Sequence, residues 1–252
     1  LFTLSGGVQG GQFWDGRAID LAAQARGPFL NPVEMNNTSK AQVIGKILAS
    51  SYAGLFNQLC GVGIIDTQYI CMSEAIAAYE GTSELNKFSS KFDAYMAGAA
   101  TLTAQEELGR QLFGGRGKCA HCHDDHGSRS LPALFTDFKY HNLGLPKNTE
   151  YPLDPNAPAD LGLGVTTGDH RDNGKFKTPH LRNIAQTAPY MHNGILKTLK
   201  DVVHFYNTRD IPGMWPAPEY PDTVSNSFLG DLGLTDAEED ALVAFMMTFT
   251  DQ

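Results

Sequence analysis

The chain has 252 residues, of which 42% are hydrophobic, enough for one large domain or two small ones with a buried core. Its net charge of -9, without a long Lys/Arg block, argues against a nucleic-acid partner, because affinity for phosphate backbones comes mainly from basic side chains. No apolar run approaches the roughly 20 residues of a membrane helix, so we expect a soluble protein without a membrane span.

Helical signals follow one another along the chain, and strand-like alternation is scarce, which predicts an all-α fold. Capping boxes at Ser39–Gln42, Thr103–Glu106 and Thr235–Glu238 each precede an amphipathic helix, and a further helix is expected over residues 67–79. The inward faces are predicted to carry Val43, Ile44, Ile47, Leu48, Leu108, Leu112, Phe113, Leu242, Val243, Phe245, Met246 and Phe249.

The rest of the chain reads as long irregular loops. Residues 127–173 and the segment RDIPGMWPAPEYPD are rich in Pro, Gly, Asp and Asn, which is loop chemistry. A boundary between two units is expected near residues 98–103.

The cysteines form two pairs. Cys60 and Cys71 flank GVGIIDTQYI, a turn leading into a helix, where a disulfide would close a short loop and imply an oxidising compartment such as the periplasm. Two free buried cysteines are the equally weighted alternative.

The second pair lies in GKCAHCHDDH, where Cys119, Cys122 and His123 form a CxxCH motif. This spacing is the attachment signature of c-type haem, because two thiols can bond the haem vinyl groups while the next histidine ligates the iron. A zinc site using His121 or His126 would need a second Cys/His pair, and a redox disulfide would need a thioredoxin-like βαβ pattern. Neither is visible, so the motif predicts covalent haem c.

The motif does not specify the sixth iron ligand. Downstream candidates are Met191, Met214, Met246, Met247, His204 and Tyr206. Met246 and Met247 lie on the predicted last helix and are expected to fill the core. His204 and Tyr206 lie in a helical pattern where such residues are usually structural.

Four segments together resemble the bacterial di-haem cytochrome c peroxidase superfamily, which includes the MauG-type enzymes of methylamine utilisation. They are QFWDGRAIDLAAQARGPFLNPVEM, AIAAYEGT, GRQLFGGRGKCAHCH and GKFKTPHLRNIAQTAPYMHNGILKTLKDVVHFYN. The resemblance implies two cytochrome c-like domains, assigned here as 1–100, the remainder of the peroxide-reacting haem domain, and 101–252, the domain with the haem of Cys119, Cys122 and His123. The family's first CxxCH lies upstream of FWDGRA, so the resemblance also implies a longer protein with a second haem.

The resemblance assigns roles to residues near the N-terminus. Trp14 matches the tryptophan that relays electrons between the two haems. Gln24 and Glu34, with Pro28 nearby, match the distal pocket of the peroxide-reacting haem, where a carboxylate moves the proton that O–O cleavage requires.

Further roles follow for the C-terminal region. Tyr206 matches a tyrosine iron ligand of MauG-type enzymes, where other family members have Met, and Met191 or Met214 is the alternative ligand. The carbonyls of Thr187 and Pro189 match calcium ligands, and Arg182 is expected to pair with a haem propionate or to form a surface ion pair.

These matches imply a periplasmic oxidoreductase that uses hydrogen peroxide to oxidise an electron donor. The donor would be a protein or peptide, such as a small cytochrome or cupredoxin. The family also makes a homodimer possible. The alternatives are a conventional cytochrome c peroxidase that reduces peroxide to water and a mono-haem electron carrier without catalysis.

Overall fold

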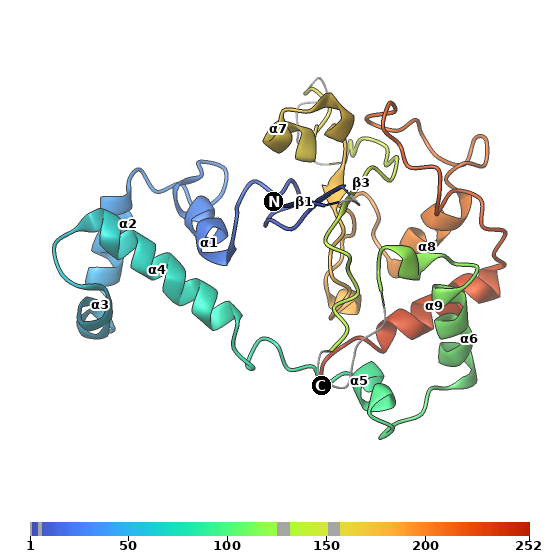
Figure 1. Ribbon diagram of the computed structural model, residues 1–252, viewed down its shortest axis with the longest axis horizontal. Helices are drawn as coiled ribbons and strands as arrows, with labels where there is room; N and C mark the ends of the chain where they lie inside the picture. Colours follow the sequence, from blue (N-terminus) through green and yellow to red (C-terminus); the bar gives the residue numbers. More distant parts are fainter. Residues whose placement is uncertain (1, 5–6, 125–131, 151–156) are drawn as a thin grey trace. The chain divides into compact units, whose positions relative to one another are not determined.

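The computed structural model describes residues 2–4, 7–124, 132–150 and 157–252 (Figure 1). The chain divides into two compact units, a larger one formed by Leu1–Gly10 and Phe88–Gln252 and a smaller one formed by Gly11–Lys87. The regular elements of both units are mainly helices, as expected, and sheet is scarce. No helix in the described ranges is long and apolar enough to cross a bilayer.

The smaller unit is a set of helices in which α1 and α2 pack on α4. Its helices are α1 (Leu21–Leu30), α2 (Lys40–Leu48), α3 (Ala53–Cys60) and α4 (Ile65–Glu80). Ser39 caps α2 by accepting from the Gln42 backbone, but the Gln42 side chain accepts from the Thr38 backbone, so the predicted capping box is only half formed. The fully buried apolar core is small: Val43, Ile44, Tyr69 and Met72.

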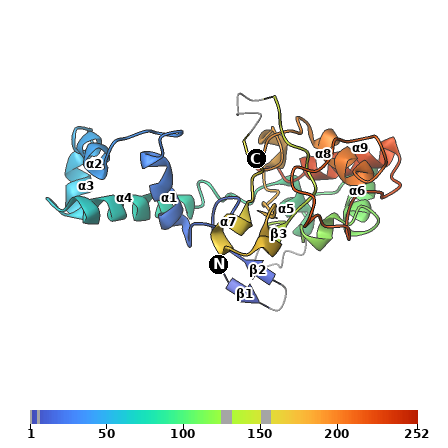
Figure 2. The ribbon, with the colours of Figure 1, turned by 90° about the horizontal axis from the view of Figure 1, so that it is seen from above.

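The larger unit contains helices joined by long irregular segments. Its helices are α5 (Lys91–Met96), α6 (Ala104–Gly114), α7 (Leu163–Thr167), α8 (Leu199–Thr208) and α9 (Asp236–Met247), with short 3-10 helices η1 (Cys119–His121), η2 (His170–Asp172) and η3 (Ile184–Gln186). Two short antiparallel pairs accompany them: β1 (Phe2–Leu4) with β2 (Gly7–Gln9), and β3 (Tyr140–His141) with β4 (Phe176–Lys177). Figure 2 shows these elements from a second direction.

The α6–α9 crossing organises the core of the larger unit. Capping boxes at Thr103 and Thr235 start the two helices, as predicted. A Cβ atom on Gly109 would lie 1.9 Å from the carbonyl oxygen of Ala241, so the absence of a side chain allows the helices to touch. The prediction that Leu108 faces the core is wrong, because its side chain is 41% exposed. Gly109 makes the helix contact instead.

A cluster of phenylalanines fills the space beneath this crossing. Phe113 and Phe245 meet edge to face at 5.4 Å between ring centroids, and Phe135 stacks on Phe249 at 3.9 Å. Phe92 of α5 contacts three of these rings. The larger unit therefore begins near Phe88, before the expected boundary at residues 98–103, because α5 belongs to its core.

Candidate functional site

The CxxCH segment forms one tight turn directly after α6. Lys118 adopts the left-handed conformation, with φ of 56°, and the 3-10 helix η1 follows. The backbone N–H groups of Cys122 and His123 both donate to the carbonyl of Cys119, at 3.2 and 2.9 Å. This turn places both cysteines and the histidine within one compact segment, as haem attachment requires.

Both thiols of the motif are free. Cys119 and Cys122 are half-buried and are not bonded to each other. Burial raises the pKa of Cys119 to about 12, so its sulfur is a neutral thiol at neutral pH. Thioether formation would consume both thiols, and neither is committed to a disulfide.

The imidazole of His123 is oriented for metal ligation. Its Nδ1 lies 2.8 Å from the carbonyl oxygen of Phe135, which selects the tautomer with the proton on Nδ1 and a lone pair on Nε2. Burial lowers the pKa of His123, so the ring is neutral at pH 7. A neutral histidine with its outer nitrogen anchored by a carbonyl is the usual form of an iron or zinc ligand.

Tyr206 lies on α8, near enough to the same cysteines for their sulfurs to affect its phenol. Burial, with the nearby Cys122 and Cys119 sulfurs, raises the pKa of its phenol above the usual value. The side chain is half-buried and packs on the core of the larger unit. The structure therefore brings Tyr206 to the CxxCH segment, on an element far from it in the sequence.

The other proposed sixth ligands differ in their surroundings. His204 directs Nδ1 to the buried carboxylate of Glu239, at 3.0 Å. Met191 packs against the core, whereas Met214 is 47% exposed. Met246 is buried on α9 as expected, but Met247 is 53% exposed and does not fill the core, because it lies on the outer face of the helix.

An unpredicted polar group adjoins the motif. Nε2 of His141, on β3, lies 3.6 Å from Sγ of Cys122 and 3.5 Å from Oδ2 of Asp137. Asp137, followed by Cys122, raises the pKa of His141 to about 9, so the ring is protonated at neutral pH. Ligand atoms of these three residues lie within 4.8 Å of one another, but a zinc ion there would require Cys122 to be free of haem. His126, named above as a zinc ligand, lies outside the described residues.

Arg182 is buried and already paired, in contrast to the expected propionate or surface contact. Its guanidinium makes a bidentate ion pair with Asp93 of α5, at 2.5 and 2.8 Å, and Nε donates to the carbonyl of Ala133 at 2.7 Å. The arginine is only 6% exposed. It joins α5 to the segment that follows β4, so its main contacts are structural.

The FWDGRA segment forms a narrow loop in the smaller unit. The N–H of Gln12 donates to the carbonyl of Ala18 at 2.7 Å, and Arg17 pairs with Asp15 at 2.9 Å inside the loop. Trp14 lies at its tip and is 41% exposed. An exposed indole held on a short, bonded loop can make contacts outside this unit.

Gln24, Pro28 and Glu34 lie close together along the chain of the smaller unit. Gln24 and Pro28 are one turn apart on the same face of α1. The exposed Glu34 lies in a turn that folds back on the end of this helix, where the Met35 N–H donates to the carbonyl of Pro28 at 3.1 Å. Buried Asn37 fixes the same turn by donating to the carbonyl of Phe29 at 2.8 Å.

Two further expectations concern covalent and metal bonds. Cys60 and Cys71 form a disulfide that joins the end of α3 to α4. The residues Thr187 and Pro189 are exposed in the turn after η3. In the described part of the chain no backbone donor bonds their carbonyl oxygens, which leaves both available to a hard cation such as calcium.

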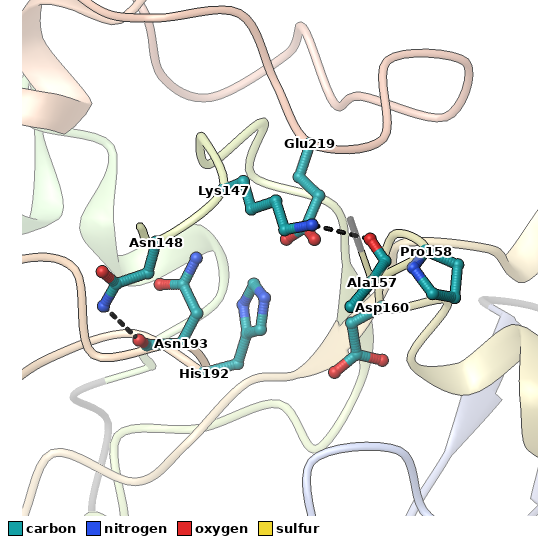
Figure 3. A pocket seen from close by; sticks show the side chains of 8 residues that line it. All are labelled: Lys147, Asn148, Ala157, Pro158, Asp160, His192, Asn193 and Glu219. Atoms are coloured by element: carbon teal, nitrogen blue, oxygen red, sulfur yellow. Dashed lines mark hydrogen bonds between the residues drawn. The ribbon is translucent and has the colours of Figure 1, made fainter. Parts of the chain in front are cut away.

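A cavity of about 340 Å³ lies in the larger unit, apart from the predicted residues (Figure 3). Lys147, Asp160, His192 and Glu219 are among its lining residues. Burial lowers the pKa of His192 to about 4, and its neutral ring stacks on Phe176 with centroids 3.5 Å apart. No local pattern predicts this cavity, because its walls come from loops that are distant in the sequence.

The crossed helices α6 and α9, the CxxCH turn between them and the anchored histidine define a cytochrome c-like domain. The sequence profile of the di-haem cytochrome c peroxidase family matches residues 3–101. The methylamine utilization protein MauG of Paracoccus denitrificans is 37% identical over 98% of this chain and 70% of its own length. The protein therefore belongs to the di-haem cytochrome c peroxidase family, which also includes the MauG-type proteins.

Other relatives support this placement. The cytochrome-c peroxidase IdrP1 of Denitromonas iodatirespirans is 32% identical over 93% of this chain. The crystal structure of the di-haem peroxidase BthA from Burkholderia thailandensis matches with a TM-score of 0.84 and 36% identity over 96% of this chain. The chain spans 63% and 66% of these two proteins, respectively.

Proposed function

We propose that the protein is a haem c oxidoreductase that uses hydrogen peroxide to oxidise a protein, peptide or small cytochrome or cupredoxin donor. Trp14 would relay electrons between the haem held by the larger unit and a second, peroxide-reacting haem. The observation that carries the proposal is the proximity of Tyr206 to the CxxCH cysteines. Bound haem supplies an iron centre that exchanges single electrons and can cleave the O–O bond of peroxide.

The residues of the larger unit hold and tune the iron. Cys119 and Cys122 would form the two thioether bonds, and Nε2 of His123 would ligate the iron. Tyr206 would be a further ligand, and its phenol would have to lose its proton to bind. An anionic oxygen ligand favours oxidised iron, which suits a haem that shares oxidising equivalents.

The residues of the smaller unit handle peroxide. The Glu34 carboxylate would accept a proton from the inner peroxide oxygen and return it to the departing one, while the Gln24 amide orients the molecule by hydrogen bonding. The turn anchored by Asn37 keeps Glu34 in place. Trp14 would pass electrons toward this pocket.

Three parts of the proposal concern the protein's surroundings. The Cys60–Cys71 disulfide supports a periplasmic location, because such bonds persist in oxidising compartments. The exposed carbonyls of Thr187 and Pro189 would contribute to a calcium site. Family membership supports a possible homodimer.

The proposal is tested on the protein as it leaves the cell, by haem stoichiometry and peroxide-driven oxidation of a reduced cytochrome c. Replacing Glu34 with Gln should lower kcat by about 10²- to 10⁴-fold. Replacing the exposed Glu84 of the same unit with Gln should leave kcat unchanged. One haem and no reaction with peroxide would instead identify a mono-haem electron carrier.

A conventional cytochrome c peroxidase is the second candidate, because relatives with that name match at similar identity and Met191 packs against the same core. The ferric optical spectrum separates the two. If Tyr206 is the ligand, Y206F changes the spectrum and M191L does not. The reverse result would favour the conventional peroxidase.

A further inference from the structure

We propose that Trp215 is the residue through which an external one-electron donor protein delivers electrons to the haem of the larger unit. This inference rests on the proposed function and specifies its donor site. Trp215 and Trp14 are the two tryptophans of the sequence, and Trp215 is the one in the larger unit.

Two aromatic side chains, Phe205 and Tyr206, connect Trp215 to the CxxCH segment. Tyr206 lies near Cys119 and Cys122, as described above. The ring of Phe205, which is fully buried, lies 6.4 Å from that of Tyr206 and 5.1 Å from that of Trp215, edge to face in both cases. Trp215 is therefore one ring away from the predicted iron ligand.

The opposite side of Trp215 is close to solvent. The residue is half-buried, and its indole N–H donates to Oγ1 of Thr208 at 3.0 Å, which fixes the orientation of the ring. Ile211 and Met214 of the same loop are exposed. The ring of the partly exposed His204 lies 6.1 Å away. The indole thus lies between the buried core and an exposed apolar loop.

The charges beside this loop favour a basic donor. His204 contacts Glu239, which also binds Lys200 at 3.2 Å. The same lysine pairs with Asp236 and Asp240 at 2.8 and 2.7 Å. The exposed Asp236 and Asp240 and the buried Glu239 therefore surround one ammonium group, so the ends of α8 and α9 that carry these residues have excess negative charge. Complementary charge on a partner accelerates encounter and makes it sensitive to salt.

Trp215 can carry this electron because indole is readily oxidised, whereas the phenyl ring of Phe205 is not. Reduction of one hydrogen peroxide to two waters consumes two electrons and two protons, and each donor iron or copper supplies one electron. After peroxide has oxidised the protein, Trp215 would lose one electron toward the haem and regain one from the donor. The indole N–H stays hydrogen-bonded to Oγ1 of Thr208 in the oxidised ring, so no proton has to leave it.

The test uses the haem-loaded full-length protein, treated with peroxide and then mixed with a reduced cytochrome c of high isoelectric point. Compared with the wild type, W215F should oxidise this donor about tenfold more slowly, and W215Y should restore most of the rate because tyrosine is also redox-active. F138L, at an exposed aromatic ring of the larger unit that lies outside this route, should stay within about twofold. Raising the salt concentration should slow the wild type more than W215F.

A second measurement separates electron transfer from packing. Peroxide without donor should oxidise Trp215 itself, seen as an oxygen-containing tryptophan in peptide mass spectra. If the wild type does not react with peroxide, both the proposed function and this inference are wrong. If it reacts but W215F matches the wild-type rate, or Trp215 stays unmodified, only the Trp215 assignment is wrong.

Discussion

The imidazole of His123 is oriented by the carbonyl of Phe135, 2.8 Å from Nδ1. Phe135 has a left-handed backbone, with φ of 55°, and a fully buried ring stacked on Phe249. Packing of the Phe135 ring in the core therefore fixes the position of its carbonyl, which in turn orients the predicted iron ligand His123.

Replacing Phe135 with Ala should lower the free energy of unfolding by about 3–5 kcal/mol, because it leaves a cavity in the core. It should also raise the reduction potential of the haem, since a weaker hydrogen bond makes His123 a less basic ligand. Denaturant unfolding and redox titration measure the two effects. Phe138, also left-handed but exposed, provides the control, and an equal loss in F138A would contradict the argument.

The His141–Asp137 pair should make stability depend on pH. The folded-state pKa of His141 is raised to about 9, whereas the pKa of histidine in the unfolded chain is about 6.5. The contribution of protonated His141 to folding stability is therefore complete below pH 6.5 and is lost as the pH rises through 9. Between pH 7 and 10 the wild type should lose on the order of 2 kcal/mol more than H141Q. Parallel pH profiles for the two proteins would refute this, and H170Q, at an exposed histidine, should behave as wild type.

The buried ion pair between Arg182 and Asp93 should be essential to the larger unit. Replacing Arg182 with Met leaves a buried carboxylate without its cation, which should cost about 3–5 kcal/mol in chemical denaturation. Arg171, 79% exposed and paired with Asp169, is the matched site. R171M should change stability by less than about 0.5 kcal/mol.

The Cys60–Cys71 disulfide should support the small core of the smaller unit. Replacing both cysteines with Ser removes the loop constraint, which should lower stability by about 3 kcal/mol. Thermal unfolding with and without a reductant measures the effect. The reductant should lower the melting temperature of the wild type and leave the double variant unchanged.

Local signals predicted the helices well. Thr103 and Thr235 start α6 and α9 as expected, because capping depends on four neighbouring residues. A capping box between Ser90 and Asp93 also starts α5, but it lies close to the expected domain boundary and no helix was predicted there. The CxxCH turn was also predictable, since its chemistry depends on spacing alone.

Long-range pairs were not predictable in the same way. Arg182 and Asp93 are 89 residues apart, and the Cys122–Asp137–His141 group forms where an irregular segment returns to the motif. The paths of such segments depend on tertiary packing, which no local pattern records. The resemblance pointed to Tyr206, but only the structure brings it to the cysteines.

The close α6–α9 crossing sets a limit for protein engineering. Alanine is the better helix former, so substitution of a mid-helix glycine ordinarily gains up to about 1 kcal/mol. At Gly109 the added methyl group would overlap the backbone of Ala241. Attempts to stabilise this protein through helix propensity should therefore leave position 109 unchanged, because the two helices that carry the CxxCH turn and its aromatic core would otherwise be pushed apart.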